Sequence, residues 1–195
     1  MKGDGAPSAS DVREASEFCH STLESLSEAD WSARAGSLEW DCRATAAHIS
    51  DALGFYAIHL GSRAGDWLKF DVVPHADASN CHLARLVGAM GEVLSQVVEV
   101  TPNEVRAYHH SGMWDRHTIA AFGCLEALVH TGDVAAGLTV PYEPPRYVCE
   151  RVVAHLFRRV ASTGDPWQIM WWATGRGDLD GERRLGADWM SYWMQ

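Results

Sequence analysis

The sequence is short of basic charge. Its 195 residues contain 16 Lys and Arg against 26 Asp and Glu, which gives a formal net charge of -10 at pH 7. Proteins that bind nucleic acid present clustered positive charge to the phosphates. This composition therefore excludes nucleic acid as the expected partner.

The sequence also lacks the cysteine patterns of disulfide frameworks and of thiolate zinc knots. The five cysteines are odd in number, widely scattered and never spaced as CxxC. They are Cys19, Cys42, Cys81, Cys124 and Cys149. We expect buried, reduced thiols.

A third absence concerns secretion and membranes. The start, MKGDGAPSASD, is polar and lacks the apolar core of a signal peptide. No later segment approaches the roughly 18 uninterrupted apolar residues that are needed to span a bilayer. We therefore predict a cytoplasmic protein with no membrane partner.

What the sequence does contain is four long patterns of helical apolar spacing before residue 140. Ser10 is the expected N-cap of the first helix, Asp41 that of the second, and Gly137 the stop signal of the fourth. The expected ranges are about 10–26, 42–60, 79–100 and 117–137. Amphipathic helices of this length match a four-helix bundle over residues 1–139, with residues 1–9 disordered.

After residue 138 the composition changes. TVPYEPPR is a proline-rich hinge, and Pro145 suits the first position of a helix that runs through Val160. The stretch PWQIMWWATGRGDLDGERRLGADWMSYWM is dense in aromatic residues and predicts a strand, a Gly-Arg-Gly turn and a final aromatic segment. We expect residues 140–195 to form a small α+β domain beside the mainly α bundle.

The segment CLEALVH places Glu126 and His130 four positions apart, so both side chains project from one face of the fourth helix. Taken alone, such a pair is more often solvated than metal-bound. His48, on the second helix among small alanines, is a candidate third ligand, although it could equally be a hydrogen-bonded core histidine. If the three converge, they form a two-histidine, one-carboxylate set with an open position, as in hydrolytic zinc and non-haem iron sites.

Such a site would hold a water or a thiolate, lower its pKa and polarise a substrate carbonyl. Asp133, three residues after His130, could accept a hydrogen bond from that ring and fix its orientation, or could simply be solvated.

Other chemically active residues fit the site less well. Neighbouring histidines point in different directions, so we expect His109, His110 and His117 at the surface, outside the metal set. Cys124 lies roughly 200° around the helix from Glu126, off the ligand face. The late tryptophans could form either a ligand floor or the core of the C-terminal domain. They include Trp171, Trp172, Trp189 and Trp193.

Three segments resemble one family. LEWDCRATAAH is similar to the segment of the mycothiol-dependent maleylpyruvate isomerase-like proteins in which a Trp precedes a capped helix with the first metal-binding His. GCLEALVHTGDVAAGL resembles the family's fourth-helix segment, and WWATGRGDL resembles the Gly-Arg motif of its C-terminal domain. The three occur in family order and span most of the chain.

The resemblance implies a DinB-like helical bundle with a divalent metal bound by His48, Glu126 and His130. Zinc is the usual ion, with iron, nickel and manganese as alternatives. It also implies mycothiol or a similar low-molecular-weight thiol as cofactor, and Arg176 matches the arginine that the family's isomerase requires. The chain departs from the family at Thr131 and Gly132, which replace the usual Gly and Trp, so the substrate does not follow from the resemblance.

We therefore expect a metal- and thiol-dependent isomerase or S-transferase acting on a small electrophile. Arg176 would hold a substrate carboxylate or a developing oxyanion. Its alternative is a surface ion pair with the nearby acids Asp178, Asp180 and Glu182. Two other functions remain open, a non-catalytic metal-dependent binding or resistance protein and a metal-dependent hydrolase that uses water. The short C-terminal portion is compatible with a homo-oligomer in which a second subunit completes the cavity.

Overall fold

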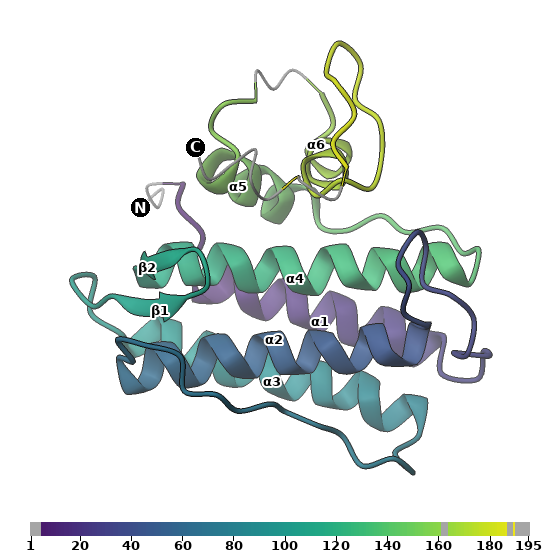
Figure 1. The fold of residues 1–195 in the computed structure, drawn as a ribbon, viewed down its shortest axis with the longest axis horizontal. Helices are drawn as coiled ribbons and strands as arrows, with labels where there is room; N and C mark the ends of the chain where they lie inside the picture. The colour runs from purple at the N-terminus through teal and green to yellow at the C-terminus, as the bar shows by residue number, and fades with distance from the viewer. Residues whose placement is uncertain (1–4, 161–163, 187–188, 190–195) are drawn as a thin grey trace.

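The computed structural model describes residues 5–160, 164–186 and 189 of the chain (Figure 1). The described part is mainly helical, as predicted, with one small hairpin. The elements are α1 (Ala9–Ser25), α2 (Cys42–Ser62), α3 (Asn80–Val100), β1 (Ala107–His109), β2 (Gly112–Trp114), α4 (Arg116–Gly137), α5 (Arg146–Leu156) and α6 (Pro166–Ala173).

Helices α1 to α4 lie side by side as a bundle, in which α1 and α2 each pack against both α3 and α4 (Figure 1). Their apolar faces form one core, since nearly every inward-facing Leu, Ile, Val and Ala is buried. The predicted helix ranges hold to within a few residues, and Asp41 caps α2 by accepting a hydrogen bond from the Ala44 N–H at 2.7 Å.

The first helix begins earlier than predicted. Ser8 is its N-cap, and the Asp11 carboxylate accepts hydrogen bonds from the backbone N–H and the hydroxyl of Ser8 at 2.8 and 2.6 Å. Ser10 was the wrong N-cap, because a capping partner three residues later matters as much as the cap itself. The predicted disorder of residues 1–9 is wrong for Ala9, which is buried in α1; residues 1–4 lie outside the described residues.

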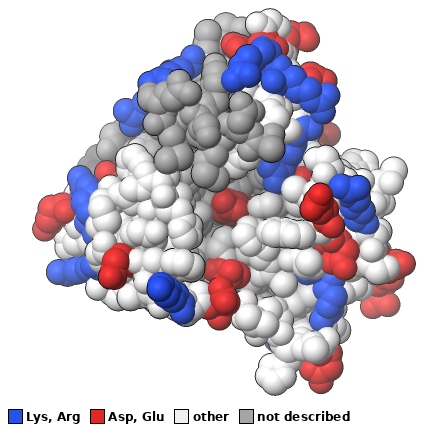
Figure 2. All heavy atoms as spheres, in the orientation of Figure 1, with Lys and Arg blue, Asp and Glu red and all other residues white. Residues whose placement is uncertain are grey.

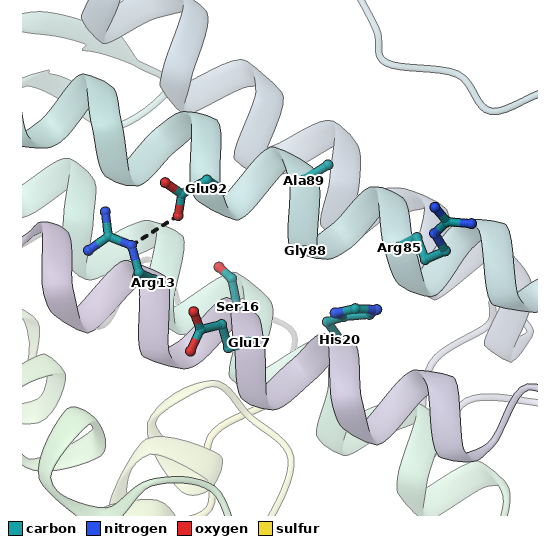
Figure 3. A pocket seen from close by; sticks show the side chains of 8 residues that line it. All are labelled: Arg13, Ser16, Glu17, His20, Arg85, Gly88, Ala89 and Glu92. Atoms are coloured by element: carbon teal, nitrogen blue, oxygen red, sulfur yellow. Dashed lines mark hydrogen bonds and ion pairs between the residues drawn. The ribbon is translucent and has the colours of Figure 1, made fainter.

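Helices α1 and α3 approach closely beside a hollow of about 330 Å³ (Figure 3). A Cβ atom at Gly91 would lie 2.0 Å from the Ser16 Oγ, so only glycine allows this approach. Arg13 and Glu92 form an ion pair of 3.0 Å between the two helices. The hollow therefore lies beside a close crossing of the two helices.

The connection from α3 to α4 contains the hairpin, whose strands pair antiparallel with Tyr108 opposite Met113. It packs against α2 near the start of α4. Helix α4 is long and apolar enough to cross a membrane by length and composition, but 78% of its most apolar stretch is buried inside the protein.

The C-terminal segment packs α5 against α4 and α6 against α5 (Figure 1). The strand predicted within PWQIMWWA is wrong, because this stretch is helix α6 with Pro166 in its first turn. Pro166, Ile169, Met170 and Ala173 are all buried, and their spacing has a helical period that outweighs the aromatic preference for strands. Over 140–160, 164–186 and 189 the structure contains no strand, so the described appendage is helical rather than α+β. The helix expected through Val160 ends at Leu156.

Candidate metal centre

His48 from α2 and Glu126 and His130 from α4 meet on the inner faces of these two helices. The ligand atoms of the three side chains all lie within 4.8 Å of one another. Glu126 Oε2 is 3.2 Å from His130 Nε2 and 3.6 Å from His48 Nε2. The structure thus brings together the three residues selected from the sequence, and the described part of the chain holds no other such group of His, Cys, Asp and Glu.

The electrostatics suit a cation. Burial by itself would raise the pKa of Glu126, but hydrogen bonds with His130 and His48 outweigh it and hold that pKa well below the usual range. Burial by itself would lower the pKa of His130, whereas Asp133 and Glu126 outweigh it and raise the pKa. An ionised carboxylate between two imidazoles is the donor set of the open sites that bind zinc or iron.

Asp133 and Arg176 hold His130 from behind. The Nδ1 of His130 donates to Asp133 Oδ2 at 3.0 Å, which leaves Nε2 to face Glu126 and His48. Arg176 donates two hydrogen bonds to the same carboxylate, from Nε to Oδ1 at 2.9 Å and from Nη2 to Oδ2 at 2.7 Å. Asp133 is fully buried and the Arg176 side chain is 9% exposed. The charge of this arginine is therefore balanced inside the protein.

This placement contradicts the surface ion pair that was the alternative for Arg176, whereas its role in substrate binding stays a prediction. Arg176 does not pair at the surface with Asp178, Asp180 or Glu182, and its guanidinium is not free. Its Nη1 donates to the Thr174 carbonyl at 3.0 Å, and its Nη2 also lies 3.4 Å from His130 Nδ1. The second N–H of Nη1 has no hydrogen-bond partner among the described residues. Gly175 makes the turn possible with a φ of +79°, and a Cβ there would lie 2.9 Å from the Gly186 carbonyl oxygen.

A cavity of about 600 Å³ opens over the three candidate ligands. One wall is the α1–α2 connection and another is the C-terminal segment. The remaining lining residues are Ser37, Leu38, Glu39, Leu125, Val129, Thr174, Gly175, Arg176, Gly186 and Trp189. Figure 2 shows acidic side chains at the hollow in the centre of this face. A small molecule in the cavity would meet the open side of the candidate metal centre.

Two side chains at the centre were not selected from the sequence. Tyr56 is buried two turns after His48, and burial together with the nearby Glu126 carboxylate raises the pKa of its phenol well above the usual value. The eight-residue spacing from His48 on one helix face was the available signal. Glu39 lines the cavity from a loop, where no periodic pattern marks it.

His109 is only partly exposed, so the prediction that it lies at the surface holds in part. Its ring stacks on Phe122 with centroids 4.4 Å apart, and its Nδ1 accepts a hydrogen bond from the Ser111 N–H at 3.0 Å. Burial lowers the pKa of His109 to about 4. His110 is exposed as expected, and the half-buried His117 contacts the Pro7 carbonyl. All three lie outside the ligand group, and Cys124 is buried.

The late tryptophans are divided between the two expected roles, lining the ligand cavity and forming the core of the C-terminal segment. Trp189 lines the cavity, whereas Trp172 is a core residue with 1% exposure. A Cβ at Gly132 would lie 2.9 Å from the Trp167 ring and 3.0 Å from the Trp171 ring. The two tryptophans of α6 therefore fill the space beside position 132, where the resembled family has its own tryptophan. Trp193 lies outside the described residues.

No family model, curated protein or solved structure matches this chain. The resemblance to the maleylpyruvate isomerase-like proteins thus stays a prediction from three sequence segments.

Proposed function

We propose that this chain is a divalent-metal-dependent enzyme that joins a low-molecular-weight thiol to a small electrophile, as an S-transferase or an isomerase. The observation that supports it most is the convergence of His48, Glu126 and His130 beneath a cavity of about 600 Å³. Three protein ligands with an open side are typical of catalytic metal sites, whereas structural sites are closed.

The ion supplies one kind of chemistry. A divalent metal lowers the pKa of a thiol or water that it binds, and so makes a nucleophile available at neutral pH. The protein residues hold this arrangement, because Asp133 fixes the His130 ring and Arg176 fixes Asp133. Tyr56 is buried near Glu126.

The reaction balances without a further reagent. The thiol loses its S–H proton, and a sulfur electron pair forms a C–S bond to the electrophilic carbon. In a transfer a leaving group departs with its bonding pair, or the electrons of a C=C bond move toward a conjugated carbonyl and the α-carbon then takes a proton. In an isomerisation the C–S bond breaks again after rotation about the former double bond, and the thiol is released unchanged.

The three family-like segments support a finer proposal. The bundle is DinB-like, the ion is zinc and the thiol is mycothiol or a close analogue. The protein acts in the cytoplasm. Its substrate differs from maleylpyruvate or is held differently, because Trp167 and Trp171 replace the aromatic contribution of position 132.

Metal analysis tests the centre. We expect about one divalent ion per chain, and a loss of that ion in each of His48→Ala, Glu126→Ala and His130→Ala. His117→Ala is the matched control, since this histidine lies outside the ligand group. Three folded variants with full metal content would place the site elsewhere.

A thiol-dependence assay then distinguishes the enzyme from its alternatives. Metal-loaded protein should convert activated aryl halides or enones only when mycothiol is added. Undiminished conversion in thiol-free buffer would favour the hydrolase. Tight binding without conversion would favour a sequestering protein.

A further inference from the structure

We propose that the cavity selects an uncharged electrophile with an apolar body and a carbonyl or nitro oxygen, and discriminates against substrates that bear a carboxylate. This inference names the substrate class of the proposed enzyme and so rests on the proposed function.

The described walls of the cavity offer no unbalanced positive charge. Arg176 is the one Lys or Arg among the described lining residues, and Asp133 neutralises it through paired hydrogen bonds. Displacing Asp133 would leave that carboxylate buried without its cation, which is costly. A substrate carboxylate therefore has no vacant guanidinium to bind.

Neither Arg34 nor Arg43 is among the described lining residues of the cavity, and both donate to backbone carbonyls. Arg34 donates to the Leu38 carbonyl, and Arg43 donates to the carbonyls of Ala76 and Ala78. In the sequence, residues 187–195 contain no Lys or Arg, so that stretch cannot supply a cationic side chain to the cavity.

Acidic groups outnumber this arginine. Glu39 lines the cavity and is exposed, with no ion-pair or hydrogen-bond partner among the described residues. Together Glu39, Glu126 and Asp133 bring three negative charges against the one positive charge of Arg176. A divalent ion balances the remaining two, and a thiolate then makes the loaded cavity negative again. An anionic substrate would enter against this charge.

The rest of the lining suits an apolar molecule that carries a polar oxygen. Leu38, Leu125, Val129 and Trp189 provide apolar surface. The remaining N–H of Arg176 Nη1 can donate to a neutral carbonyl or nitro oxygen, for which a full unpaired charge is not required. The geometry thus favours recognition by hydrogen bonds and apolar contact over ion pairing.

The test uses an ester and its acid. Zinc-loaded protein is assayed with mycothiol and either methyl 4-chloro-3,5-dinitrobenzoate or 4-chloro-3,5-dinitrobenzoate, which share the reacting carbon. After division by the uncatalysed rates, kcat/KM should favour the ester by on the order of tenfold or more. Equal values, or a preference for the acid, would overturn the inference and leave the proposed function intact.

A charge-reversal variant tests whether Glu39 causes the preference for the ester over the acid. Glu39→Lys should reduce the preference to about threefold or less, because it places a cation at the cavity wall. Glu104→Lys makes the same charge change in the exposed loop after α3 and should keep the wild-type preference. A preference that both variants retain would remove Glu39 from the explanation and contradict the charge argument.

Binding of unreactive analogues makes the inference independent of turnover. Methyl 3,5-dinitrobenzoate and 3,5-dinitrobenzoate lack the leaving group, and nitroaromatics quench the fluorescence of a contacting tryptophan such as Trp189. The ester should bind zinc-loaded protein on the order of tenfold more tightly with mycothiol present. If neither aryl chloride reacts but the ester still binds more tightly, the proposed function fails while the cavity keeps its charge selectivity. Equal binding would overturn the selectivity.

Discussion

The orientation of the His130 ring depends on two residues, Asp133 and Arg176, that are not themselves candidate metal ligands. The Asp133 carboxylate accepts a hydrogen bond from His130 Nδ1, and two nitrogens of Arg176 donate to the same carboxylate. Carboxylates that accept from a metal-binding histidine fix its tautomer and ring orientation. Because Asp133 is fully buried, a change in either partner should reach the metal centre.

The first prediction concerns Asp133. Asp133→Asn should weaken metal binding by about 10- to 100-fold, because a neutral amide is a poorer acceptor for the His130 N–H and leaves Arg176 without its counter-charge. Competition with a chelator of known affinity measures the change. Asp51→Asn is the matched control, since Asp51 accepts from the Val72 N–H and has no hydrogen bond or ion pair with His48, Glu126 or His130 in the described part of the chain. Equal affinities in the two variants would show that Asp133 does not support the centre.

The second prediction concerns Arg176, and it distinguishes positioning from substrate binding. Lysine offers a point charge and cannot make two parallel hydrogen bonds to Asp133. Arg176→Lys should therefore weaken metal binding in the absence of any substrate, by about tenfold. A substrate-binding arginine would instead leave metal affinity unchanged and lower turnover alone. Chelator competition combined with initial rates at saturating metal separates the two outcomes.

At the scale of elements, the helix crossing of α1 and α3 provides the third prediction. Gly91→Ala should lower the free energy of unfolding by about 1–3 kcal/mol, because the new Cβ would lie 2.0 Å from the Ser16 Oγ. Helix propensity alone would favour alanine by about 1 kcal/mol, so a loss points to the contact.

The control for this substitution is Gly61→Ala in α2, where the nearest atom to a Cβ would be 3.5 Å away in ordinary contact. That variant should be neutral or more stable. Denaturant unfolding at equilibrium measures both. If Gly91→Ala were as stable as Gly61→Ala, the two helices would have room to separate at this crossing.

The elements show which structural features the sequence can predict. The four bundle helices were predictable because each buries one face in the core, and the apolar residues of that face recur in the sequence with a 3.6-residue period. In the C-terminal segment the composition and the period disagreed, and the helical period was correct for α6. The hairpin of β1 and β2 was missed, since three-residue strands are too short to establish a period.

At the scale of the whole molecule, the candidate site combines local and distant contacts. Glu126 and His130 could be paired from the sequence because they share a helix face, and the small residues around His48 marked it as a candidate. Arg176 reaches Asp133 across 43 residues of sequence, and Glu39 arrives from a loop. Such contacts depend on the paths that the connecting segments take across the bundle. No periodic pattern in the sequence indicates those paths. The charge of the cavity was therefore visible only in the folded chain.

The fourth prediction concerns all five thiols. Burial raises the pKa of Cys19 and Cys149 to about 12 and that of Cys42 to about 11, and it raises the pKa of Cys124 well above its usual value. These four thiols are protonated at neutral pH and shielded from reagents. Cys81 is half-buried at the start of α3 and does not line the cavity.

A disulfide reagent at pH 8 should therefore modify about one thiol per folded chain, and all five after unfolding. Cys81→Ser should abolish the reaction of the folded protein and leave metal content and thiol-dependent turnover unchanged. Peptide mapping of the modified chain identifies the reacting residue. Rapid modification of a second thiol at the cavity would supply an internal nucleophile, and the requirement for an added thiol would then lose its physical basis. With only Cys81 reactive and away from the cavity, the proposed reaction would need a sulfur nucleophile from outside the chain.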